Sequence, residues 1–194
     1  MSIKRLNGAG IYGSKSNKVW DQTTTLNDFQ SIATVVVPSG GQSSVTFSNI
    51  PSTFTHLQVR AICSSSSAPD FANLKVNSDT TGSNYARHLL YADGGSVTAA
   101  ASTGSTITNL GKISNSSTIM ATFIVDILDY ANANKNKTIR SLGGYDSNGS
   151  GEIDFNSILW MNTNAITSLQ FTTYNSANFV QYSSFALYGI KAAS

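Results

Sequence analysis

The sequence has little charge. Asp, Glu, Lys and Arg together make up 11% of its 194 residues, well below the roughly 25% of an average globular protein. Uncharged polar residues take their place, with 30 Ser, 20 Thr and 18 Asn. Hydrophobic residues still reach 40%, which argues against a disordered chain. Low charge, abundant Ser, Thr and Asn, and 15 Gly favour a β-rich domain with polar turns.

Cysteine is almost absent, and long apolar runs are missing. The single Cys63 excludes an intrachain disulfide and a CxxC zinc motif. It ends the segment THLQVRAIC on the same face as Leu57 and Val59, so we expect a small buried hydrophobe. No stretch of about 20 apolar residues occurs, so no membrane span is predicted. No apolar run follows the basic residues of MSIKRLNGAG, so no signal peptide is predicted.

Residues suited to catalysis are scarce. Of the two histidines, His56 lies on the expected solvent face of its strand and His88 follows Arg87. Asp126 and Asp129 are three apart in an expected strand and point to opposite faces. No GxSxG, HExxH, P-loop or dinucleotide fingerprint is present. We therefore predict a protein that is not an enzyme and holds no cofactor, while a carboxylate pair assembled by the fold, as in a glycosidase, stays open.

Residues 146–157, DSNGSGEIDFNS, resemble the start of a calcium-binding EF-hand loop. Asp146, Asn148 and Ser150 fall where that loop places oxygen ligands. Its twelfth position needs a bidentate Glu, but Ser157 stands there, and no helical pattern flanks the segment. Asp, Asn and Gly are also the residues that hairpin turns require. We therefore favour a turn between two strands over a metal site.

Residues 1–30 differ from the rest of the chain. Four basic residues precede the first acidic residue, Asp21, whereas the remaining chain has eight Lys and Arg against ten Asp and Glu. A basic segment can contact nucleic acid or dock on an acidic protein surface. Without an aromatic-rich basic groove, docking is favoured and no nucleic-acid partner is predicted. The expected partner-binding residues of this extended arm are Lys4, Arg5, Ile11, Tyr12, Lys15, Lys18, Val19 and Trp20.

From residue 31 to residue 194 the pattern is strand, turn, strand. Short alternating segments recur with Gly, Pro, Asn and Ser turns between them, and no helical period is sustained. This pattern predicts one all-β domain, an antiparallel β-sandwich of jelly-roll type with roughly eight to ten strands. The candidate strand segments are 31–37, 43–50, 55–63, 74–78, 85–91, 94–110, 119–130, 138–145, 152–162, 166–174 and 179–191, of which 94–110 has the weakest pattern.

Aromatic residues recur along the strands and at their ends. Such residues can stack on sugar rings, although most aromatics in a β-sandwich pack in the core or across strands. The candidate ligand-binding residues are Asp70, Arg87, His88 and Tyr91.

Several segments together resemble virion structural proteins of tailed bacteriophages, especially phages of aquatic bacteria and cyanobacteria. They are KRLNGAGIYGSKSNKVWDQ, IPSTFTHLQVR, SNYARHLLY, DYANANKNKTIRSLGGYDSNGSG and FVQYSSFALYGIK. The resemblance covers most of the chain, and the ending SSFALYGIK is similar to a final strand of phage surface proteins labelled tail fibre, decoration or structural protein. It implies an assembly role and a β-sandwich, and it carries no catalytic motif.

The combined expectation is a structural protein of the virion surface, made in the host cytoplasm and anchored by its arm to capsid or tail proteins. A homo-oligomer is expected because virion sites come in rings of identical positions. The alternative is a receptor- or carbohydrate-binding adhesin at a tail tip, with a host surface glycan as its partner.

Overall fold

The computed structural model describes residues 29–67, 70–105 and 107–191, which form antiparallel strands and one 3-10 turn, η2 (Gly82–Asn84). The strands are β1 (Phe29–Val36), β2 (Ser44–Phe47), β3 (His56–Cys63), β4 (Asp70–Val76), β5 (Tyr85–Ala92), β6 (Val97–Ser105), β7 (Thr108–Ile113), β8 (Ala121–Leu128), β9 (Lys137–Asp146), β10 (Gly151–Trp160), β11 (Leu169–Thr173) and β12 (Ser184–Ile190).

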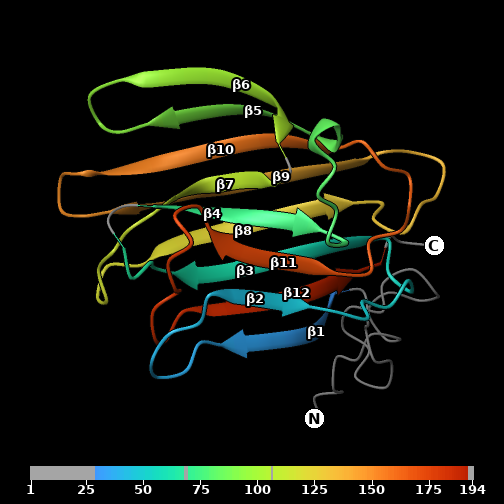
Figure 1. Ribbon diagram of the computed structural model, residues 1–194, viewed down its shortest axis with the longest axis horizontal. Coiled ribbons are helices and arrows are strands. Elements are labelled where there is room, and N and C mark those ends of the chain that lie inside the picture. Colours follow the sequence, from blue (N-terminus) through green and yellow to red (C-terminus); the bar gives the residue numbers. More distant parts are fainter. Residues whose placement is uncertain (1–28, 68–69, 106, 192–194) are drawn as a thin grey trace, which may run out of the picture.

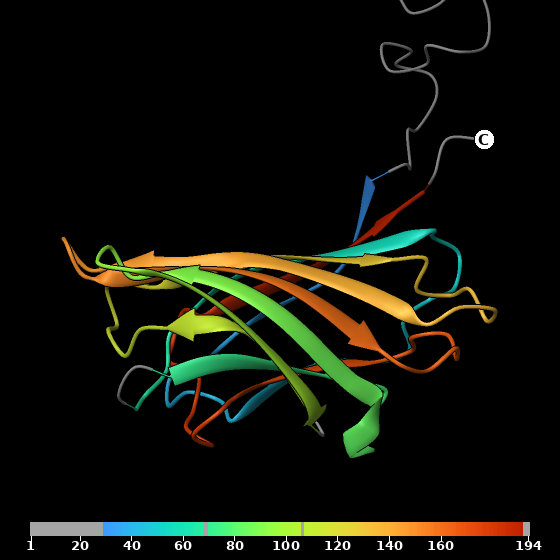
Figure 2. The same cartoon turned by 90° about the horizontal axis from the view of Figure 1, so that it is seen from above.

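These strands form two sheets. The larger has eight strands in the order β1-β12-β3-β8-β9-β10-β5-β6, and the smaller has four in the order β2-β11-β4-β7. The sheets lie in two layers (Figures 1 and 2), and the β5–β6 hairpin curls from the larger sheet toward the level of the smaller one. All strand pairings are antiparallel. The prediction of an all-β antiparallel fold is confirmed.

The hydrophobic core lies between the two sheets. Alternation along β3 buries Leu57, Val59 and Cys63 on one face. Across the core, the rings of Phe171 in β11 and Phe185 in β12 lie 5.3 Å apart and join the two layers. The expectation that Cys63 is a buried small hydrophobe is confirmed, and burial raises the pKa of its thiol to about 12.

The strand predictions differ from the structure mainly between residues 94 and 113. The long strand expected at 119–130 is confirmed as β8, but the stretch 94–110 contains β6 and the start of β7. The described chain therefore has twelve strands, and the expected eight to ten was too few. β6 consists largely of Ala, Ser, Thr and Gly, and most of its residues are exposed on both faces. It therefore has no apolar alternation by which the sequence could reveal it.

The predicted arm, residues 1–30, lies outside the described residues apart from Phe29 and Gln30. These two belong to β1, so the first strand begins two residues earlier than expected. No helix in the described part of the chain is long and apolar enough to cross a membrane.

The free edge of β7 is covered by buried polar side chains of the larger sheet. The carbonyl oxygen of Leu110 accepts hydrogen bonds of 2.8 Å from Ser141 Oγ and from Asn156 Nδ2. The backbone N–H of Lys112 donates to Asp154 Oδ2 at 2.9 Å. An edge strand inside the protein exposes backbone groups that need such partners. These contacts hold the smaller sheet against β9 and β10.

Because of these contacts, β10 has polar side chains on its inner face and apolar side chains on its outer face, the reverse of the usual pattern. Glu152, Asp154 and Asn156 point inward and are buried, whereas Ile153 and Phe155 point outward and are 58% and 48% exposed. The inner positions serve the edge of β7, so the apolar side chains between them occupy the outer face of the larger sheet.

Candidate functional site

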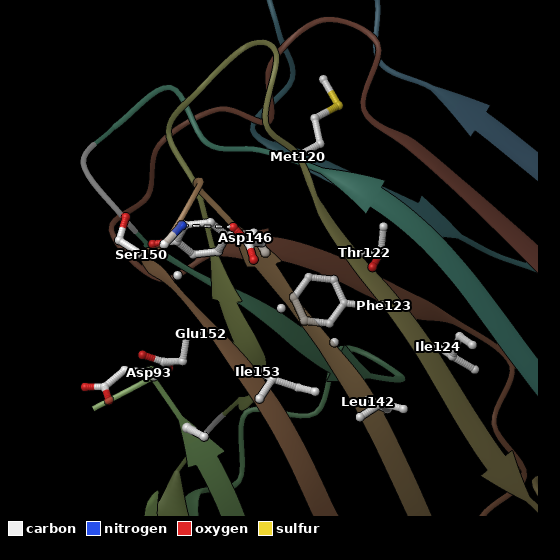
Figure 3. A pocket seen from close by; sticks show the side chains of 17 residues that line it. Asp93, Met120, Thr122, Phe123, Ile124, Leu142, Asp146, Ser150, Glu152 and Ile153 are labelled. Atoms are coloured by element: carbon white, nitrogen blue, oxygen red, sulfur yellow. Dashed lines mark hydrogen bonds between the residues drawn. The ribbon is translucent and has the colours of Figure 1, made fainter. Parts of the chain in front are cut away.

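A hollow of about 620 Å³ lies over one end of the outer face of the larger sheet (Figure 3). Its apolar floor comes from three neighbouring strands, with Ile124 on β8, Leu142 on β9 and Ile153 on β10. Met120, which precedes β8, also lines it. The turns after β5 and β9 lie along its rim. A concave apolar surface of this size suits a ligand or the side chains of a partner.

Two glycines shape the hollow. Gly143 and Gly144 follow each other in β9 and leave the sheet without side chains between the neighbouring strands. A Cβ at Gly143 would lie 2.1 Å from the ring of Phe123, and one at Gly144 would lie 2.0 Å from the carbonyl oxygen of Glu152. Gly144 also has a φ of +137°, which favours glycine. The close packing around this end of the sheet therefore requires both residues.

The floor of the hollow continues into an apolar band across the sheet. In one row of paired residues, Ile124 is opposite Leu142, Leu142 opposite Phe155, and Phe155 opposite Leu90. The adjacent row begins at Ile62 and runs to Val97. The apolar band is made of large side chains that are 44–72% exposed: Ile62, Leu90, Val97, Ile124, Leu142, Ile153 and Phe155.

The rim of the hollow is acidic. Asp93 lies in the β5–β6 turn and Asp146 at the start of the β9–β10 turn, and both are exposed. The backbone N–H groups of Ser96 and Gly95 donate to Asp93 at 2.8 and 2.9 Å. These bonds lower the pKa of Asp93, so it carries a negative charge at neutral pH. The site therefore combines an apolar floor with acidic loops, which suits a segment that is both apolar and basic.

The stretch beginning at Asp146 is a hairpin turn, as expected. β9 ends at Asp146, which pairs with Gly151 at the start of β10. Oδ1 of Asp146 accepts from the backbone N–H groups of Asn148 at 2.7 Å and Gly149 at 3.4 Å. Asn148 and Gly149 have φ of +58° and +98°. Among the described residues, no group of three or more His, Cys, Asp or Glu is placed to hold a metal ion.

The four predicted ligand-binding residues are not brought together. Asp70 is buried and accepts backbone hydrogen bonds from Phe71 and Asn175, so its role is to hold turns. Arg87 and His88 are neighbours on β5, so their side chains point to opposite faces. His88 is exposed and lies opposite Ser157 of β10, whereas Tyr91 is partly buried and lies opposite Asp154.

Of the four residues, Arg87 lines a cavity. This second cavity, of about 190 Å³, lies between the inner side of β5 and β6 and the start of β7, with Tyr174 at its wall. Arg87 makes one long hydrogen bond of 3.4 Å to the carbonyl oxygen of Asn109. Burial lowers the pKa of its guanidinium, and the nearby Asp154 opposes that effect. Oγ1 of Thr108, which also lines the cavity, is buried without a hydrogen-bond partner.

The inward carboxylates of β10 have structural partners. Glu152 accepts a hydrogen bond of 2.9 Å from Lys112 Nζ, and Asp154 accepts from the backbone of Lys112. Asp154 is 4% exposed and lines neither cavity. Burial raises the pKa of Asp154 to about 6, although the bond from Lys112 acts in the opposite direction. In these positions both carboxylates support the packing of the two sheets.

The eight arm residues predicted to bind a partner, from Lys4 to Trp20, lie outside the described residues. The apolar band was not predicted. Its sequence signal is the contiguous apolar run FIV at 123–125, in which both faces of a strand are apolar, and the pattern EIDFN at 152–156. Neither pattern alone says which face is inside.

Comparison with known proteins identifies no relative. No family model matches the chain, and no curated protein or solved structure matches it significantly. The function has to be inferred from the surface and the fold described above.

Proposed function

We propose that the protein is a non-enzymatic structural protein of a bacteriophage virion. In this proposal it is a surface β-sandwich, attached to the capsid or tail by its N-terminal arm and present as a homo-oligomer. The observation that carries the proposal is the apolar band. Its seven large apolar side chains lie on one face of the larger sheet, and each is about half exposed or more. Contiguous patches of this kind are typical of surfaces that become buried on assembly.

The strand order supports a jelly roll as the fold of this sandwich. Four strands of the larger sheet run β1-β12-β3-β8, and the smaller sheet runs β2-β11-β4-β7. Along the chain, β1 to β4 alternate between the two sheets, and β11 and β12 do so again. Eight strands in two such sheets are the jelly-roll arrangement found in viral capsid proteins. The hairpins β5–β6 and β9–β10 are then insertions that widen the larger sheet.

The attachment role is tested by deleting residues 1–25 in the phage that carries this protein. The deletion leaves every described strand in place, so we expect a folded body with an unchanged far-ultraviolet spectrum. Purified particles should then lack the protein. A truncated protein that still joins particles at the normal level would show that the arm is not the anchor.

The second candidate function is recognition of a host glycan, and it rests on the Arg87 cavity. A half-buried guanidinium with one long hydrogen bond and the unpartnered hydroxyl of Thr108 can bind a carboxylated sugar. Titration with glucuronate, with glucose as the neutral control, tests this function. Binding of glucuronate that Arg87→Met abolishes supports it, and equal failure of both sugars removes it.

A further inference from the structure

We propose that in the free protein residues 11–20 lie across the apolar band of their own chain. Val19 and Trp20 would cover the end of the band at Ile62 on β3, and Ile11 and Tyr12 the end at Val97 on β6. This inference concerns the isolated subunit and does not depend on a virion role. On a particle, the same segment could serve as an anchor only after leaving the band.

The band offers a surface that an apolar segment can cover. Leu142, Ile153 and Phe155 are 48–58% exposed in neighbouring strands, and the hollow of about 620 Å³ lies beside them. Burial of such side chains is favourable in proportion to the apolar surface that is removed from water. Residues 11–20 supply two apolar pairs, Ile11-Tyr12 and Val19-Trp20.

Charge favours the same segment. Residues 1–20 contain four basic and no acidic residues. Lys15 and Lys18 stand between the two apolar pairs, and the acidic turns of Asp93 and Asp146 flank the hollow. The basic residues of this face lie on the other side of the Ile62-to-Val97 row from the acidic turns, because Arg60 is paired with Ile124. Arg140 lies one row further away and is paired with Asp126.

The length of the segment matches the band. Ile62 and Val97 are in register across five strand intervals, which span about 24 Å at roughly 4.8 Å each. Tyr12 and Val19 are seven residues apart, about 23 Å in an extended chain. Both apolar pairs can therefore reach the two ends of the band at once.

The tether to β1 is also long enough. Phe29 is in register with His56 on β3, two strands away, which is about 10 Å across the sheet. Ile62 lies six residues further along β3, about 20 Å, so Phe29 and Ile62 are roughly 22 Å apart. The nine residues from Trp20 to Phe29 span up to about 30 Å. Figure 2 shows the start of β1 (blue) rising on the side of the larger sheet away from the smaller one.

Attachment to the same chain is what selects this occupant over a second copy. A short tether to β1 gives the segment an effective concentration on the order of millimolar at its own band. A second copy in dilute solution cannot compete with that concentration.

Disulfide trapping in the full-length protein tests the inference. Ser16→Cys is combined with Ser150→Cys, because Ser150 is exposed at the rim of the hollow. The buried Cys63 does not compete. We expect a monomeric crosslinked product whose yield does not depend on protein concentration. The control pairs Ser16→Cys with Thr46→Cys, which is exposed on the smaller sheet, and should not crosslink. Crosslinked dimers would assign the band to a second copy, and equal yields in both pairs would overturn the proposal.

A second measurement does not require new cysteines. The chain has two tryptophans, and Trp160 is 1% exposed, so quenching by acrylamide reports on Trp20. Leu142→Asp should increase the quenching, whereas Thr46→Asp, exposed on the smaller sheet, should leave it unchanged. Quenching that is already maximal in the unmodified protein would refute the docking of Trp20.

Discussion

The backbone N–H of Lys112 donates a hydrogen bond of 2.9 Å to Oδ2 of Asp154, and this bond joins the free edge of β7 to the inner face of β10. It explains why a carboxylate is buried between the sheets. It also explains why Ile153 and Phe155, the alternate residues of β10, point outward. The polar contacts to the edge of β7 and the apolar residues Ile153 and Phe155 of the band therefore come from opposite faces of the same strand, β10.

The buried Asp154 should make stability depend on pH. Its pKa rises from 3.8 to about 6 on folding, so its contribution is most favourable below pH 3.8 and is lost as the pH rises through 6. Asp154→Asn is neutral and keeps an oxygen that can accept from Lys112. When the pH is raised from 4 to 7, the free energy of unfolding of this variant should increase by about 1–2 kcal/mol relative to that of the unmodified protein. Urea unfolding at both pH values measures this, and parallel pH profiles of the two proteins would contradict it.

The carbonyl of Leu110 should show coupling between its two donors. Ser141→Ala and Asn156→Ala each remove one hydrogen bond of 2.8 Å and should cost about 1 kcal/mol. The double variant leaves a buried carbonyl with neither donor, so it should cost more than the sum, by roughly 1 kcal/mol. A double-mutant cycle in urea tests this, and strict additivity would mean that the two donors act independently.

Gly144 should be far less tolerant of a side chain than Gly149. Both have positive φ, +137° and +98°. A Cβ at Gly144 would lie 2.0 Å from the carbonyl oxygen of Glu152, whereas nothing lies within 4 Å of one at Gly149. Gly149→Ala should cost about 1 kcal/mol, and Gly144→Ala at least about 3 kcal/mol or loss of folding. Thermal unfolding of the two variants compares them, and equal melting temperatures would show that β9 can move to relieve the contact.

Part of this fold follows from sequence because local chemistry determines it. The turn at Asp146 and the buried face of β3 depend on residues close together in the chain, so their patterns are sufficient. The orientation of β10 depends on the edge of β7, about 40 residues earlier. Alternation in EIDFN shows two faces but does not say that the polar face is inside. The apolar band could not be predicted for the same reason.

Substitutions in the apolar band should affect assembly rather than folding. Ile153 is 58% exposed, so Ile153→Asp should change the free energy of unfolding by about 1 kcal/mol or less. The same variant should lose incorporation into particles, while Thr46→Asp, exposed on the smaller sheet, should keep it. Normal incorporation of Ile153→Asp would remove the band from the assembly surface.

The most direct test of the proposed virion role is the number of copies of this protein in purified phage particles, measured by quantitative mass spectrometry. A structural protein at symmetric sites should be present in a fixed ratio to the capsid or tail proteins, and the ratio should survive repeated gradient purification. Absence from purified particles, or a ratio that falls with each purification step, would contradict the proposed function.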